Sequence, residues 1–309
     1  MTQRRTTRRV LVHGLIYFGP IFARFMDGDG WEFRYYPDKG VRNLAAMLGE
    51  MTRSDVLYQL GGRVTEGKFL KVAHALSKNK IVMHWLGSDT LDEQIQVSQQ
   101  KSDAWVLGKL HHWAESQWMV DEVEALGVPC QLVPFPSALV PDGPSALREQ
   151  FRVLVYVPSI KRGELYGLDR ILSVARDCPD VSFDLVGLID GPIPEVPANL
   201  HVYGRLPNLS EFYERCSVVW RPVRHDGVSW MVLEALGHGR HVLWTYPFPG
   251  CIQVGDDFDA REQITRLHEL HRRGLLQLNH EGLRFTRYCY HPATLRKNIH
   301  LKLQSILDS

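Results

Sequence analysis

The stretch that decides the fold is RPVRHDGVSWMVLEALGHGRHVLW, which runs from Arg221 to Trp244. Its residues predict a strand, an acidic loop with a glycine turn, a helix, and a second strand after a further glycine. Seven residues separate Asp226 from Glu234, which places the two carboxylates on nearly the same side of the segment. The free N–H groups and the positive dipole end of such a helix attract phosphate. We therefore expect an anion site flanked by two acids, which suits a sugar joined to a nucleotide diphosphate.

The rest of the composition narrows the class of protein. A length of 309 residues indicates two domains of about 150 residues each. The 36 basic residues nearly balance the 35 acidic ones, so the overall charge does not suggest nucleic acid as a partner. No run reaches the roughly 20 apolar residues that span a bilayer. Five scattered cysteines without a CxxC pair indicate reduced thiols in the cytoplasm and argue against a zinc site.

One local exception to the charge balance lies at the N-terminus, where four arginines occur within nine residues: Arg4, Arg5, Arg8 and Arg9. They are interpreted either as a solvated leader or as a weak contact with anionic lipid headgroups. Such a contact contributes roughly 1 kcal/mol per basic residue near a charged surface. The second interpretation predicts a cytoplasmic protein peripheral to the inner face of the membrane.

Strand-like and helical segments alternate twice along the chain, which is typical of βαβ units and a parallel sheet. In the first half, strands are expected over 9–16, 31–38, 80–89 and 104–107, with a helix around 116–126. A linker follows, rich in proline and glycine: Pro134, Pro136, Pro141, Gly143 and Pro144. The second series predicts strands over 151–159 and 181–187 and a helix over 259–273. The result is an α/β protein with an N-terminal domain over 1–140 and a C-terminal domain over 141–290.

Two common nucleotide-binding motifs are missing. The first strand-to-helix turn reads HGLIYFGP, so the GxGxxG fingerprint is absent, and no GxxxxGK[ST] occurs. Both dehydrogenase and NTPase functions are therefore disfavoured. Gly14 and Gly19 still permit a close backbone approach to a ligand, or they simply allow the turn itself.

The second half resembles the retaining glycosyltransferases of the GT-B fold, notably glycosyltransferase family 4. That family carries a pattern like EGFG…LEAMA.G.PV, which here reads DGVS at 226–229, LEAL at 233–236 and GRHV at 239–242. The similarity is strongest over 151–250 and weaker over 81–136. The first acid is shortened to Asp226, and Ser229 replaces the second glycine of the turn.

The resemblance implies roles for these residues. Asp226 would contact the hydroxyls of the donor sugar, and Glu234 would contact the ribose hydroxyls. The backbone N–H groups of Gly227, Val228 and Ser229 would hold the diphosphate. Vicinal hydroxyls are good donors to a fixed carboxylate, so the residue chemistry agrees.

The family also places an arginine and a lysine after the first strand of the second domain. Here that segment is VPSIKRGELYGLDRI, in which Gly167 matches but Tyr166 stands where the lysine is expected. Loss of one cation could cost several kcal/mol of transition-state stabilisation, as an order of magnitude. Either Lys161, Arg162 or Arg205 compensates, or activity is low or absent. The alternative for Lys161 and Arg162 is a solvated loop.

Further site residues follow from the same resemblance. Gly204, Arg205 and Leu206 would border the nucleotide base. His84, at the end of KIVMHW, would hydrogen-bond a sugar hydroxyl or a phosphate, unless it is a buried structural histidine.

Aromatic residues of the first domain are candidates for the acceptor site. His112, Trp113 and Trp118 could line an acceptor groove, although core packing is expected for at least one of the tryptophans.

The implied architecture is two Rossmann-like domains that face a central cleft, with a C-terminal helix over 291–309 returning to the N-terminal domain. The implied reaction moves a sugar from a nucleotide diphosphate donor to an acceptor hydroxyl, with retention and without metal or cofactor. Glycan, polysaccharide or glycolipid synthesis would use such a reaction. Two alternatives remain open: a non-catalytic nucleotide-sugar binder or partner subunit, and a sugar-nucleotide 2-epimerase, which the acidic spacing disfavours.

Overall fold

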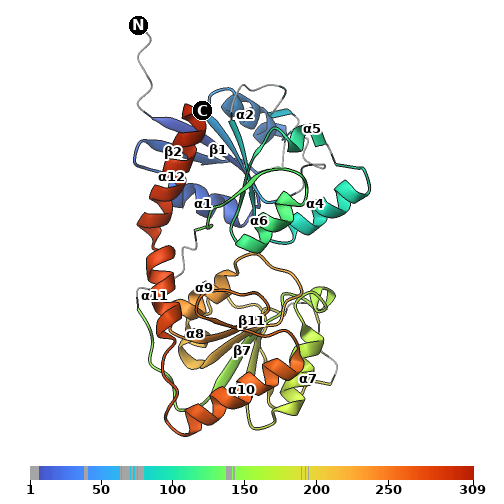
Figure 1. The fold of residues 1–309 in the computed structure, drawn as a ribbon, viewed down its shortest axis with the longest axis vertical. Coiled ribbons are helices and arrows are strands. Elements are labelled where there is room, and N and C mark those ends of the chain that lie inside the picture. Colours follow the sequence, from blue (N-terminus) through green and yellow to red (C-terminus); the bar gives the residue numbers. More distant parts are fainter. Residues whose placement is uncertain are drawn as a thin grey trace. The chain divides into compact units, whose positions relative to one another are not determined.

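The computed structural model divides the chain into two compact units (Figure 1). The first consists of Met1–Ala138 together with Pro292–Ser309, and the second of Leu139–His291. The structure describes residues 7–37, 41–62, 64, 70, 72, 73, 75, 80–102, 104–136, 141, 143–188, 190, 191, 193 and 195–309. The chain therefore leaves the first unit before the second begins and returns to it with its last helix.

The first unit contains a parallel six-stranded sheet in the order β2-β1-β3-β4-β5-β6. Its strands are short apolar runs that parallel pairing buries on both faces. All five residues of β3 are buried, for example. The strands are β1 (Arg8–Gly14), β2 (Trp31–Tyr35), β3 (Val56–Leu60), β4 (Lys80–Trp85), β5 (His111–Ala114) and β6 (Cys130–Leu132).

The helices of the first unit follow the strands in alternation. They are α1 (Phe18–Met26), α2 (Val41–Met51), α4 (Asp89–Ser98), α5 (Ala104–Leu107), α6 (Gln117–Glu124) and α12 (Pro292–Asp308). Helix α12 belongs to this unit because its buried side chains pack there. The His300 ring stacks on Trp31 at 5.3 Å between ring centres, and His300 Nε2 lies 3.0 Å from the Met26 carbonyl oxygen.

One predicted strand is wrong. Residues 104–107 form helix α5, and the strand of this region is β5, over His111–Ala114. A four-residue apolar run does not distinguish a strand from a buried helical turn, whereas HHWA looks too polar for a central strand. The strand tolerates His112 because Trp85 Nε1–H donates to its Nδ1 at 3.1 Å and its Nε2 lies 2.8 Å from the Leu107 carbonyl oxygen.

The second unit contains another parallel six-stranded sheet, in the order β12-β11-β10-β7-β8-β9. Its strands are β7 (Arg152–Tyr156), β8 (Ser182–Val186), β9 (Leu200–Val202), β10 (Val218–Arg221), β11 (His241–Trp244) and β12 (Cys251–Gln253). Its helices are the 3-10 turn η1 (Ile160–Arg162), α7 (Leu168–Asp177), α8 (Ser210–Arg215), α9 (Trp230–Gly237), α10 (Asp257–Arg272) and α11 (His280–Cys289). The alternating α/β organisation expected for this half is confirmed, while β12 and α11 are additions that the sequence did not indicate.

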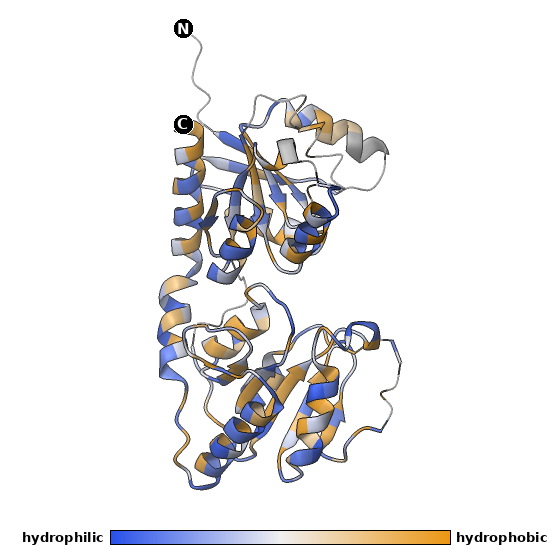
Figure 2. Cartoon of the chain, turned by 45° about the vertical axis from the view of Figure 1, so that its right-hand side comes forward, coloured by the Kyte–Doolittle hydropathy of each residue, from blue (hydrophilic) through white to orange (hydrophobic). Residues whose placement is uncertain are grey.

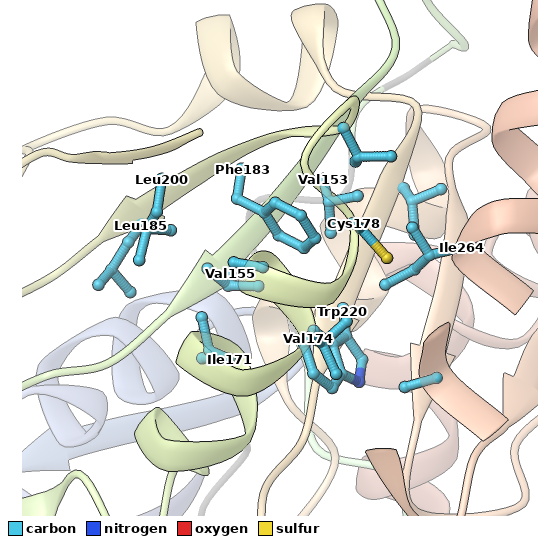
Figure 3. Close-up of a cluster of buried hydrophobic side chains, with 14 of the residues drawn as sticks. Val153, Val155, Ile171, Val174, Cys178, Phe183, Leu185, Leu200, Trp220 and Ile264 are labelled. Atoms are coloured by element: carbon cyan, nitrogen blue, oxygen red, sulfur yellow. The ribbon is translucent and has the colours of Figure 1, made fainter. Parts of the chain in front are cut away.

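The core of the second unit lies between its sheet and its helices (Figure 3). Side chains of β7 and β8, such as Val155 and Phe183, contact Val174 of α7 and Ile264 of α10 within one cluster. Helices α7 and α10 carry both hydrophilic and hydrophobic residues (Figure 2), whereas every residue from Met231 to Gly237 of α9 is buried. Among the described residues, no helix combines the length and apolar character that a bilayer crossing requires.

Of the N-terminal arginines, Arg4 and Arg5 lie outside the described residues. Arg8 and Arg9 begin strand β1 and are engaged within the unit. The Arg8 guanidinium lies 5.2 Å from the centre of the Trp31 ring, and Arg9 Nε donates to Glu32 at 2.9 Å.

Candidate donor-binding site

The second sheet has a topological switch point between β7 and β10. From β7 the chain builds outward through β8 and β9, and from β10 it builds the other way through β11 and β12. In open α/β sheets, ligands bind beyond the carboxyl ends of the strands at such a point. Tyr156 ends β7 and Arg221 ends β10, so these two residues mark the position where a ligand is expected.

Arg221 is the central cation of this edge. Its side chain is only 7% exposed, and its Nε donates to Asp226 Oδ2 at 2.6 Å. Its guanidinium carbon lies 5.3 Å from the ring centre of Tyr166 and 5.9 Å from that of Tyr156. Burial alone would lower the pKa of Arg221, but Asp226 and the two tyrosines outweigh burial and raise it. The charge is therefore permanent.

The hydroxyl of Tyr156 feels the charges of further arginines. Gly187, with φ of +96°, follows β8, and a Cβ there would lie 2.4 Å from the Tyr156 ring, so glycine is required for the ring to sit at this place. Burial raises the pKa of the Tyr156 hydroxyl and Tyr166 adds to the rise, while Arg221, Arg205 and Arg162 oppose it. The charges of three guanidinium groups therefore act on this one hydroxyl.

The segment after β7 carries the predicted cations Lys161 and Arg162. Both are exposed and lie in the turn η1, which Ser159 caps by accepting from Arg162 N–H at 3.3 Å. The Arg162 guanidinium carbon lies 5.3 Å from the Tyr166 ring centre, the same distance as that of Arg221. Arg162 therefore lies at the same tyrosine ring as Arg221. The backbone N–H of Lys161 donates to Asp190 Oδ2 at 3.5 Å.

Helix α9 begins beside these cations. Its N-cap, Ser229, makes no side-chain capping hydrogen bond, and the Ser229 carbonyl oxygen accepts from Val232 N–H at 3.0 Å, which starts the helix. Gly227 and Val228 are buried in the preceding loop. The Asp226 N–H donates to the Tyr246 hydroxyl at 3.2 Å, which ties the loop to the end of β11.

Glu234 lies on α9 and is only 8% exposed. Burial raises its pKa to about 7, and the adjacent Tyr213 hydroxyl opposes part of the rise. Tyr213 is also close enough to Arg221 for its own pKa to respond to that charge. Tyr213 therefore connects the predicted ribose-binding acid with the arginine cluster.

The predicted base-pocket residues follow β9. The Gly204 carbonyl accepts from Gly187 N–H at 3.3 Å, which places this loop beside the end of β8. Arg205 is exposed and Leu206 half-buried. Of the three, Arg205 acts on the site through its positive charge, which opposes the rise in the pKa of the Tyr156 hydroxyl.

Sequence reasoning missed two residues that organise the site, Arg221 and Tyr156. Both stand at the last position of a strand at the switch point, and the order of strands was the signal that would have identified them. Arg221 also opens the stretch that predicts the fold, five residues before Asp226.

The arrangement is chemically suited to a polyanion that also carries hydroxyl groups. Three arginines and a helix N-terminus supply positive charge, and two carboxylates supply acceptors. A separate cavity of about 340 Å³ lies at the opposite edge of the sheet, near the first residues of β7 and β8, and touches none of these residues.

Comparisons with known proteins agree with the fold. The sequence matches no protein-family model and no curated protein sequence. Solved structures do match: HepE from Anabaena in complex with UDP-glucose has a TM-score of 0.69 at 12% identity, over 96% of this chain and 99% of HepE. Sucrose-phosphate synthase from Thermosynechococcus elongatus has a TM-score of 0.73 at 12% identity, over 98% of this chain and 100% of the synthase.

A third structure covers its protein only in part. The pneumococcal O-GlcNAc transferase GtfA, in complex with UDP and GlcNAc, has a TM-score of 0.57 at 13% identity, over 86% of this chain and 60% of GtfA. The chain has the GT-B fold.

In the first domain of this GT-B fold, His84 is fully buried at the end of β4. Its Nδ1 lies 2.8 Å from the Tyr58 hydroxyl and its Nε2 lies 2.9 Å from the Val133 carbonyl oxygen. Since a carbonyl only accepts, Nε2 carries the proton and Nδ1 accepts. Burial lowers the pKa of His84 to about 3. Both nitrogens are engaged, which favours the structural histidine that the sequence left open over the predicted donor contact.

The structure also gives a packing or backbone reason for other candidates in the first domain. Gly14 has φ of +108°, and a Cβ there would lie 2.2 Å from the Leu60 carbonyl oxygen, so the turn itself explains this glycine. His112 and Trp113 are buried in the core at 3% and 1% exposure, which makes them unavailable to an acceptor. Trp118 is a partly buried side chain that packs against a hydrophobic cluster of the first unit, which includes Trp85 and Met119.

Proposed function

We propose that this chain is a glycosyltransferase that moves a sugar from a nucleotide diphosphate donor to an acceptor hydroxyl. The observation that carries the proposal is the meeting of Arg162 and Arg221 at the Tyr166 ring, close to the N-terminus of α9 and at the switch point of the second sheet, with the charge of Arg205 acting on the same edge. HepE and GtfA, which share the fold, were solved with UDP-glucose and with UDP and GlcNAc. The second unit would bind the donor and the first the acceptor.

In this mechanism the departing diphosphate gains negative charge as the sugar leaves. Arginines fixed at this edge stabilise that charge without reorganisation, which is the largest contribution that many transferases make. The diphosphate then takes the proton of the acceptor hydroxyl. We propose that the anomeric configuration is retained and that the arginines fill the role for which other transferases use a resident metal.

The other donor contacts would come from the two acids. Glu234, half-ionised near pH 7, would accept from the ribose hydroxyls. The acceptor would be a glycan, a polysaccharide or a glycolipid precursor.

The first experiment is a thermal-shift screen with UDP, GDP, ADP, CDP and dTDP and their common sugar conjugates. A ligand that binds only the folded state raises stability by RT ln(1 + [L]/Kd). Glu234→Ala should abolish the shift, whereas the matched change at exposed Glu211 should not. If no compound stabilises the protein, or if both variants behave alike, the donor-site assignment is wrong.

A second candidate function is a non-catalytic nucleotide-sugar binder or partner subunit. It is favoured by Tyr166, which occupies the place where the related family has a cation, and by the pairing of Arg221 with Asp226. Binding without hydrolysis or transfer of the same nucleotide sugar across a broad acceptor panel would select this alternative.

A further inference from the structure

Arg221 combines deep burial with unused donors. It is 7% exposed, and within the part of the chain that the structure describes its only hydrogen bond runs from Nε to Asp226. A guanidinium has five N–H donors in a fixed fork, so the two terminal nitrogens remain for another acceptor. A buried cation with unused donors is costly to leave without a ligand.

The surroundings of those nitrogens favour an anion. The tyrosine rings at positions 156 and 166 flank the guanidinium, and Arg162 and Arg205 add positive charge to the same edge. The guanidinium of Arg221 already pairs with one carboxylate, that of Asp226, through Nε. Phosphate oxygens could accept from the two terminal nitrogens of Arg221. Such a bidentate contact suits arginine better than lysine.

This geometry changes the role of Asp226. Its Oδ2 lies 2.6 Å from Arg221 Nε, a charge-assisted hydrogen bond that fixes the plane of the guanidinium. The resemblance alone assigns this acid to the donor sugar. The hydrogen bond instead makes Asp226 a partner of the arginine, from which only four residues of the loop separate it.

We propose that Arg221 binds the phosphate oxygens of the donor diphosphate through its terminal nitrogens, and that Asp226 is a positioning residue that holds this guanidinium. The inference rests on the proposed transfer reaction. In that reaction the bond between the anomeric carbon and the diphosphate oxygen breaks, and its electron pair stays on the diphosphate. The acceptor oxygen bonds to the anomeric carbon, and its proton passes to the departing phosphate. Arg221 stabilises the charge that this step creates.

The test compares four variants by calorimetric titration: Arg221→Gln, Arg221→Lys, Asp226→Asn, and Arg224→Gln as a matched control. Arg224 lies in the same loop and is exposed, with a 2.7 Å ion pair to Glu164. The probes are whichever of UDP, GDP, ADP, CDP and dTDP the parent binds, together with its glucose conjugate. The free proteins are first compared by melting temperature, and Arg221→Lys replaces Arg221→Gln if the glutamine variant does not fold.

The Arg221→Gln variant is expected to bind the nucleoside diphosphate about 10- to 100-fold more weakly, and Arg221→Lys by a smaller factor, since a charged hydrogen-bond pair is lost or displaced. Asp226→Asn should weaken the binding of the sugar-free nucleotide by about the same factor as the binding of the sugar conjugate. Arg224→Gln should resemble the parent.

Three results would overturn the inference. If the Arg221 variants bind the nucleoside diphosphate as tightly as the parent, Arg221 does not contact the phosphates. If Asp226→Asn weakens the binding of the sugar conjugate alone, Asp226 contacts the donor sugar and is not a positioning residue for Arg221. In both cases the parent still binds nucleotides, so the proposed function survives. A parent that binds none of the five nucleotides contradicts the proposed function itself, and this inference with it.

Discussion

A buried carboxyl group makes the stability of this protein sensitive to pH through Glu234. Its pKa is about 7 in the folded chain against 4.5 in the unfolded one. The unfolded chain therefore releases this proton first, so stability contributed by the protonated group is present below pH 4.5 and is lost as pH rises to about 7. Glu234→Gln mimics the protonated form and should be more stable than the parent at pH 8, by on the order of 3 kcal/mol.

Chemical unfolding at pH 5 and at pH 8 measures this effect. The parent and the glutamine variant should agree at the lower pH and separate at the higher one. Glu211→Gln, an equal charge change on the exposed side of α8, should show no such separation. Parallel pH profiles for the parent and Glu234→Gln would contradict the assignment.

His84 offers a second prediction at a single residue. We expect its ring to stay neutral between pH 5 and 8, with the proton on Nε2, because burial holds its pKa at about 3. Its contribution to stability is present above pH 6.5 and is lost as pH falls toward 3. Long-range ¹H–¹⁵N spectra distinguish the tautomers, and the same residue in urea serves as the reference. A ring that titrates near pH 6.5 in the folded protein would restore it as a candidate for chemistry.

Some of the site could be predicted from the sequence and some could not. Arg162 and Arg205 are candidate cations in the sequence because the family resemblance places a cation and the base-bordering loop at their positions. Arg221 was missed because its importance depends on which strands are neighbours, and a local pattern does not contain that order. His84 was ambiguous for a similar reason: its partners Tyr58 and Val133 come from other strands or segments, so local sequence cannot distinguish a ligand from a core residue.

At the scale of elements, the start of α7 depends on one glycine. Gly167 is the N-cap and has φ of +67°, and a Cβ there would lie 2.2 Å from the Pro222 carbonyl oxygen, next to Arg221. Gly167→Ala should destabilise the fold by several kcal/mol, because the left-handed backbone costs roughly 1–2 kcal/mol and the clash adds to it. It should also weaken nucleotide binding.

The chain provides a matched control in Gly274, which has φ of +66° but nothing within 4 Å of the Cβ position. Gly274→Ala should therefore cost only the backbone contribution, about 1–2 kcal/mol. Denaturant titrations of the two variants separate the strain from the clash. Equal losses would show that Pro222 gives way without cost.

The elements themselves were largely predictable wherever apolar periodicity was strong, as in β1, β7 and α10. The misplacement of β5 has a specific cause, since His112 gains its partners Trp85 and Leu107 only in the folded unit. The three-residue strand β12 is too short to leave a periodic signal.

At the scale of the molecule, the last helix completes the first unit. Leu303 is fully buried on α12, whereas Leu301 is 58% exposed on the same helix. Leu303→Ala should cost about 2–5 kcal/mol and Leu301→Ala well under 1 kcal/mol. Hydrogen exchange should place the loss in α1 and β2, where Met26, Trp31 and Phe33 contact His300 of this helix, and should leave the second sheet protected.

The path of the chain through its two units has a consequence for synthesis on the ribosome. Everything in Leu139–His291 emerges before α12 does, so the unit that begins first must wait longest for its final helix. Nascent chains halted soon after His291 has left the exit tunnel should resist protease over the second sheet and remain sensitive over the first. The order in which the two halves mature would then be the reverse of the order in which they are translated.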